Sequence, residues 1–116
     1  MLKTILKRLL DPYPVRSMTI ALMRLLRLGG YPWRARTGAV QRPAYGYCVY
    51  HAAVLARKLG YDRISVLELG VGDGGGLVNL EYHAKQTSKS TGIDIDVYGL
   101  DTGEGLPEPL DYRDLP

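Results

Sequence analysis

The sequence is poor in the residues that disulfide-stapled folds and metal centres need. Cys48 is the only cysteine, which excludes an internal disulfide framework and a zinc site built from several cysteines. The only two histidines, His51 and His83, are far apart in the chain and show no metal-ligand spacing. The sequence therefore predicts neither a disulfide scaffold nor a metal site.

Long apolar runs are also missing. The longest one near the N-terminus, residues 18–28, contains two arginines and is shorter than the roughly 20 residues that a membrane span requires. Lys3, Lys7 and Arg8 lie where a signal peptide would have its apolar core. We therefore expect a cytoplasmic protein, with no more than weak contact between its basic N-terminal helices and a membrane surface.

Acidic residues are almost absent from the first half of the chain. Residues 1–60 carry eleven Lys or Arg but only one acid, Asp11, so their charge is about +10. Residues 61–116 carry four Lys or Arg and eleven acids, so their charge is about −7. This asymmetry is unlike a uniformly basic nucleic-acid binder, and no nucleic-acid module accompanies the arginines, so no nucleic-acid partner is expected.

The 116 residues are 46% apolar and 23% charged, close to the globular average and enough for one modest core. We predict helices over residues 2–10, 15–28 and 45–59. Residues 31–44, with two prolines and three arginines, are expected to be a loop. Apolar residues at helical spacing form one face of the second helix and the buried stripe of the third: Met18, Ala21, Leu22, Leu25 and Leu28, then Val49, Ala52, Ala53, Ala56 and Leu59.

The pattern changes after residue 60, so residues 1–60 are interpreted as a helical cap and residues 61–116 as a β-α-β unit. The apolar, β-branched run 64–69 predicts a strand buried on both faces. A helix over 75–86, a polar turn over 87–92, a strand over 93–100 and an irregular tail follow. We expect Leu77, Leu80, Tyr82 and Ala84 to be the buried positions of that helix.

The order strand, glycine-rich turn, helix, strand and acid predicts a nucleoside-binding site. Gly70 and Gly72 have no Cβ atoms, so a ligand can closely approach the backbone N–H groups of the turn. Asp101 follows the second strand, and a right-handed crossover places this acid beside the turn, at the carboxyl edge of the sheet. We expect Asp101 to accept both hydrogen bonds of a ribose 2′,3′-diol there.

Two segments carry a resemblance to a known family. Residues 68–74, Glu-Leu-Gly-Val-Gly-Asp-Gly, resemble the E-x-G-x-G-x-G signature of class I S-adenosylmethionine-dependent methyltransferases. Residues 97–107, Val-Tyr-Gly-Leu-Asp-Thr-Gly-Glu-Gly-Leu-Pro, are similar to the "GFDTFEGLP" segment of bacterial macrocin-O-methyltransferase-like enzymes, a group often tied to sugar modification. The resemblance covers about residues 64–107.

The resemblance implies methyl transfer from S-adenosylmethionine, to an oxygen of a small molecule or sugar. It implies that Glu68 lies near the amino group of the methionine portion and that Asp101 binds the ribose hydroxyls. Gly70, Gly72 and Gly74 would lie under the adenosine and methionine. It assigns no catalytic base and no metal ligand.

The fold that the resemblance implies is α/β, with N-terminal helices followed by a Rossmann-like β-α-β unit. This unit is part of a sheet that normally has seven strands, whereas the sequence shows signals for two. We therefore expect an N-terminal fragment of a larger methyltransferase, inactive alone without its acceptor site.

The same glycines fit a second interpretation. Gly70-x-Gly72-x-x-Gly75 matches the G-x-G-x-x-G fingerprint of dinucleotide-binding turns, as in an NAD-type oxidoreductase. Glu68 argues against it, because a carboxylate close under the turn repels a pyrophosphate but suits a cationic methionine group. No Gly-Lys-Ser/Thr follows the glycines, which excludes a P-loop.

The methyltransferase and dinucleotide interpretations also differ in which acid of the second strand they would use. Asp94 is nearer than Asp101 to the dinucleotide spacing of about 20 residues, but Asp94 and Asp96 begin the predicted strand, at the wrong end for the site. A third interpretation is a non-enzymatic module whose basic helices bind a membrane or a partner. His83 is expected at the surface or half-buried. Tyr45, Tyr47 and Tyr50 precede the first strand, where the resemblance allows an element that borders the cofactor or acceptor pocket, but an ordinary core or surface role is favoured.

Overall fold

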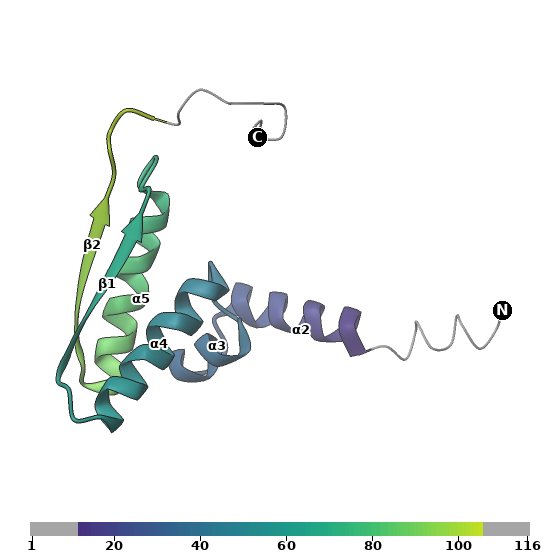
Figure 1. Ribbon diagram of the computed structural model, residues 1–116. Coiled ribbons are helices and arrows are strands. Elements are labelled where there is room, and N and C mark those ends of the chain that lie inside the picture. Colours follow the sequence, from purple (N-terminus) through teal and green to yellow (C-terminus); the bar gives the residue numbers. More distant parts are fainter. Residues whose placement is uncertain (1–11, 106–116) are drawn as a thin grey trace.

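Four helices and a two-stranded parallel sheet are present in residues 12–105, the part of the chain that the computed structural model describes (Figure 1). They make a small α/β fold, as the sequence predicts. The elements in chain order are α2 Pro12–Leu26, α3 Tyr31–Thr37, α4 Pro43–Lys58, β1 Arg63–Leu69, α5 Gly75–Thr91 and β2 Asp94–Leu100. The helix expected over residues 2–10 and nearly all of the predicted irregular tail lie outside the described residues. Within residues 12–105, no helix is long and apolar enough to cross a membrane.

Strands β1 and β2 pair in parallel and are joined by α5, which confirms the predicted order of strand, helix and strand. Helix α5 continues to Thr91, so the polar turn expected over 87–92 is wrong. The hydroxyl groups of Ser90 and Thr91 donate hydrogen bonds to helix carbonyls three and four residues earlier, and Gly92 ends the helix with a φ of 75°. The hydroxyl groups of these serine and threonine residues are therefore hydrogen-bonded within the helix, and the residues do not end it.

Helix α3 replaces part of the loop that the sequence predicts over residues 31–44. Pro32 lies in the first turn of α3, where the missing N–H of proline removes no helical hydrogen bond. Gly38 ends the helix with a φ of 80°, and its N–H donates to the carbonyl of Arg34. The seven-residue helix is thus bounded by local signals that a count of prolines and arginines does not show.

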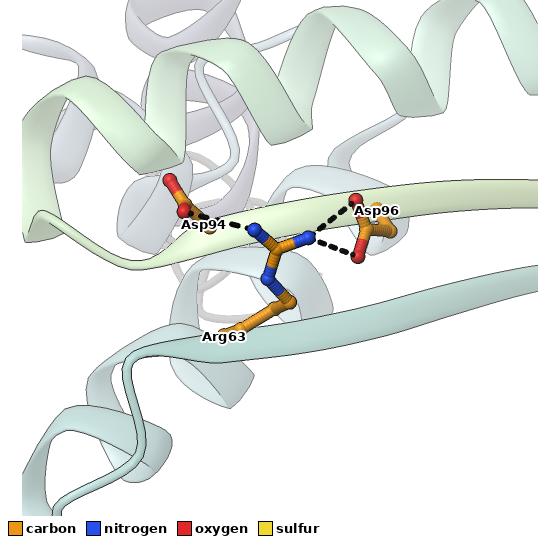
Figure 2. A network of polar contacts seen from close by, with 3 residues as sticks. All are labelled: Arg63, Asp94 and Asp96. Atoms are coloured by element: carbon orange, nitrogen blue, oxygen red, sulfur yellow. Dashed lines mark hydrogen bonds and ion pairs between the residues drawn. The ribbon is translucent and has the colours of Figure 1, made fainter.

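Helices cover only one face of the sheet in the part of the chain that the structure describes (Figure 1). Residues alternate along β1 between half-buried and exposed, so the prediction of a strand buried on both faces is wrong. On the open face, Arg63 forms ion pairs with Asp94 at 3.3 Å and Asp96 at 3.0 Å (Figure 2). Exposed apolar residues continue this face toward the carboxyl edge: Leu67, Leu69, Tyr98 and Leu100.

The core lies where α3 and α4 pack against α5, and it includes Tyr31, Ala35 and Val40. The predicted stripe of α4 is partly confirmed, because Val49, Ala53 and Ala56 are buried whereas Ala52 and Leu59 are exposed. In α5, Leu80 and Ala84 are buried as expected, Leu77 is half-buried and Tyr82 is exposed. Helix α2 projects away from the sheet, so the apolar side chains of its predicted face are exposed: Met18, Ala21, Leu22 and Leu25.

His83 is completely buried, contrary to the expectation of a surface or half-buried residue. Its Nε2 donates to the carbonyl oxygen of Gln41 at 2.8 Å, because that oxygen can only accept. Its Nδ1 then accepts from the phenol of Tyr31 at 3.0 Å, and Tyr31 accepts from Thr87 at 3.3 Å. Burial lowers the pKa of His83 below its ordinary value of 6.5. His83 therefore joins α5 to α3 and to the segment before α4.

Candidate functional site

The turn after β1 takes a shape that favours glycine at three positions. Gly70, Gly72 and Gly74 have φ values of 80°, 55° and 83°, which side chains with a Cβ atom rarely adopt. A Cβ atom at any of the three would have no neighbour within 4 Å. The glycines are therefore required by the backbone conformation, and they leave that side of the turn open.

Asp101 lies directly beside this turn, because the register pairs Leu69 with Leu100 at the end of the two strands. Its Oδ2 accepts hydrogen bonds from the backbone N–H of Val71 at 2.7 Å and of Gly72 at 3.0 Å. Its Oδ1 accepts from the N–H of Gly103 at 2.7 Å. These three hydrogen bonds lower the pKa of Asp101 below its ordinary value of 3.8, and the bond from Gly103 has the largest effect.

The turn and the residues at the end of β2 border an open hollow of about 760 Å³, which we call the Asp101 hollow. Its lining consists of Gly70, Gly72, Leu100, Asp101, Thr102, Gly103 and Gly105. Backbone amides occupy three of the roughly four acceptor positions of the carboxylate. One position is left for a ligand donor, whereas the sequence leads us to expect two.

Glu68 lies on the helix-covered face of the sheet, beneath the first turn of α5. Its Oε1 accepts a hydrogen bond of 2.7 Å from the phenol of Tyr45 on α4, which raises the pKa of Tyr45 above its ordinary value of 10.0. Its Oε2 is buried and has no hydrogen-bond partner among residues 12–105. Gly76 packs so closely on this carboxylate that a Cβ atom there would overlap it. Glu68 is thus a half-buried carboxylate under the glycine turn, with only one of its two oxygens hydrogen-bonded within residues 12–105.

A second and larger hollow of about 1340 Å³ lies on the other side of the turn. Asp73, Gly74 and Gly75 form one wall, and four arginines contribute to the rest: Arg24, Arg27, Arg34 and Arg42. We call this hollow the arginine groove. Gly74 lines this groove, whereas Gly70 and Gly72 line the Asp101 hollow.

The predicted site residues therefore fall into three neighbouring places. Gly70, Gly72 and Asp101 meet in one hollow, Glu68 lies beneath α5, and Gly74 borders the arginine groove. Asp94 and Asp96 lie at the opposite end of β2, as the sequence predicts. No cluster of metal-ligating side chains occurs within the described ranges.

Comparisons with known proteins leave the family open. No protein-family model matches the chain, and neither the curated proteins nor the solved structures give a match. The geometry of the glycine turn and its neighbours is therefore the basis for a functional proposal.

Two features of the site are missed by the sequence analysis. For Tyr45 an ordinary role is favoured there over a place beside the pocket, although its position before the first strand points to the pocket. The arginines of the groove are not grouped there, because they come from separate segments. Tyr31 and Ala35 of α3 are buried, so packing of α3 into the core helps to bring these segments together.

Proposed function

We propose that this chain binds S-adenosylmethionine through a Rossmann-like β1-α5-β2 unit and serves methyl transfer to an oxygen of a small molecule or sugar. One observation carries the proposal. Among residues 12–105, a buried carboxylate oxygen of Glu68 has no hydrogen-bond partner, and it lies beneath the same glycine turn whose N–H groups contact Asp101.

The charge of Glu68 favours a cationic ligand. A buried acceptor left without a donor costs about 1–3 kcal/mol, and an ammonium group beside Oε2 would remove that cost. A pyrophosphate at the same place would add a like charge to a buried one. This is the physical reason for preferring S-adenosylmethionine to a dinucleotide.

The residues around the turn support the proposal, with Glu68 beneath the turn and outside the lining of both hollows. Glu68 would hold its amino group, and Asp101 has one acceptor position for a ribose hydroxyl. Gly70 and Gly72 leave the backbone open to close approach, while Gly74 extends the turn toward α5. When bound, S-adenosylmethionine supplies an electrophilic methyl group. The contribution of this chain is to hold and orient the reactants.

Binding of S-adenosylhomocysteine tests the proposal directly. Calorimetry should show that the chain binds this product and that Glu68→Gln and Asp101→Asn each weaken its affinity at least tenfold. Asp94→Asn is the matched control, because it removes one carboxylate of β2 at the opposite end of the strand. Circular dichroism should show the same helix content in all variants.

A dinucleotide is the second candidate ligand, and the arginine groove favours it. Four arginines line a hollow with Gly74 and Gly75, where a dinucleotide would place its pyrophosphate. Titration with NADH separates the two candidates. Binding of NADH without binding of S-adenosylhomocysteine contradicts the methyltransferase proposal.

A further inference from the structure

We propose that the arginine groove binds the phosphate or carboxylate group of a small molecule other than the cofactor, and that the methyl acceptor carries this group. The anion site follows from the arginines themselves. Its assignment to the acceptor rests on the proposed function.

The groove has a large excess of positive charge. Its arginines come from four places: Arg24 from α2, Arg27 after α2, Arg34 from α3 and Arg42 at the start of α4. None of the four forms an ion pair with a carboxylate of residues 12–105. Asp73 is the only acid that the described part of the chain contributes to the lining, and its Oδ1 accepts from the N–H of Gly75 at 3.0 Å. An anionic ligand would offset the mutual repulsion of the guanidinium groups.

Few donor groups of these arginines are used within residues 12–105. The Nε of Arg34 is buried and lacks a hydrogen-bond partner in the described part of the chain. Arg24 uses one terminal nitrogen, Nη2, to donate to the carbonyl of Gly38 at 3.2 Å. Arg42 lies 5.6 Å from the ring centre of Tyr45. Planar guanidinium groups with free N–H donors are suited to phosphate and carboxylate oxygens.

The position of Arg42 is held by an unusual backbone conformation. Arg42 has a φ of 45°, in the left-handed region that residues other than glycine rarely adopt. Its Nη2 lies beside Gly75, at the first turn of α5. The positive end of this helix dipole adds to the charge of the guanidinium group. An anion between them would contact both.

The shape of the groove favours a small molecule. The exposed side chains of Leu25 and Val78 contribute apolar surface beside the arginines, and the groove is concave. A hollow with both kinds of lining can hold the body of a molecule together with its charged group. The flat surface of a lipid bilayer would contact only the rim.

The groove and the Asp101 hollow flank the same turn. Gly72 lines the Asp101 hollow, and the next residue, Asp73, lines the groove. A ligand in the groove would therefore lie next to a nucleoside in the hollow without occupying its place. This arrangement suits a cofactor and its acceptor.

Inorganic pyrophosphate is the probe for the anion site. Titration of the full chain at constant ionic strength should show saturable binding, which Arg24→Gln and Arg42→Gln each weaken at least fivefold. Both residues are exposed, so the variants should fold. Arg36→Gln is the matched control, because Arg36 is an exposed arginine of α3 outside the groove. Equal weakening by Arg36→Gln would show a general charge effect and overturn the proposal.

Two further titrations separate the possible sources of the anion. Pyrophosphate should bind with unchanged affinity in the presence of saturating S-adenosylhomocysteine, and competition between them would refute a separate site. Binding to phosphatidylglycerol vesicles without binding to pyrophosphate would assign the arginines to a membrane surface and also overturn the proposal.

The two proposals can fail independently. Binding of pyrophosphate without S-adenosylhomocysteine would keep the anion site and refute both the methyltransferase proposal and the assignment to an acceptor. Binding of S-adenosylhomocysteine without pyrophosphate would refute the anion site alone.

Discussion

The phenol of Tyr45 donates a 2.7 Å hydrogen bond to Oε1 of Glu68, although the two residues are 23 positions apart in the chain. The bond connects α4 to β1 and holds one oxygen of the carboxylate. The other oxygen, Oε2, is left buried without a partner within residues 12–105. The orientation of Glu68 under the glycine turn therefore depends on a residue outside the β-α-β unit.

Removing the Tyr45 hydroxyl should weaken cofactor binding if the proposed function is correct. Tyr45→Phe leaves Glu68 charged but removes the donor that holds Oε1. We expect a several-fold loss of affinity for S-adenosylhomocysteine in calorimetry, smaller than the loss caused by Glu68→Gln. Tyr47→Phe, which removes the hydroxyl of an exposed tyrosine on the same helix, should have no effect. Equal affinities of Tyr45→Phe and the unchanged chain would contradict this role.

A side chain at position 76 should displace Glu68. The Cβ atom of Gly76→Ala would overlap the Glu68 carboxylate, so the strand, the helix or the side chain must move. Because the overlap is with the end of a side chain that Tyr45 holds, we expect urea unfolding to show a loss at the lower end of the range of about 1–3 kcal/mol that overpacking costs. Gly30→Ala is the control, since its Cβ would lie 3.8 Å from Cδ of Pro32, an ordinary contact, and its φ is −68°. Unchanged stability of Gly76→Ala would mean that Glu68 is not confined as described.

The buried His83 should make the fold sensitive to mild acid. Its pKa is lowered by burial, so the unfolded chain binds a proton at this histidine more readily than the folded chain does. Its contribution to stability is complete above the ordinary pKa of 6.5 and is lost as the pH falls below that value. Urea unfolding at pH 8 and pH 5.5 should show this loss, and His83→Gln should reduce the dependence on pH. An identical dependence in both proteins would exclude His83 as its source.

The strand, turn and helix around the candidate site are predictable because their signals are local. The β-branched run before Gly70 favours a strand, and the glycines permit left-handed backbone conformations at the positions where the turn requires them. The place of Asp101 follows from the parallel arrangement alone, because the carboxyl ends of both strands meet at one edge.

The remaining features depend on tertiary packing. His83 lies on the buried stripe of α5, three residues after Leu80, but a histidine there gives no sign of the partners that satisfy it, because Tyr31 and Gln41 are distant in the chain. The arginine groove has the same origin, since no spacing within one segment predicts that Arg24 and Arg42 line one hollow. Helix α3 is local in origin, but its two glycine boundaries and its proline also fit a loop.

The three amide contacts of Asp101 also bear on how quickly a ligand can be captured. Val71, Gly72 and Gly103 donate to one carboxylate, so the loops after β1 and β2 are tied together before any ligand arrives. The conformational entropy of these loops is therefore lost when the chain folds and not when a ligand binds. A molecule that enters this hollow meets a preorganised rim, and its capture need not wait for a slow loop closure.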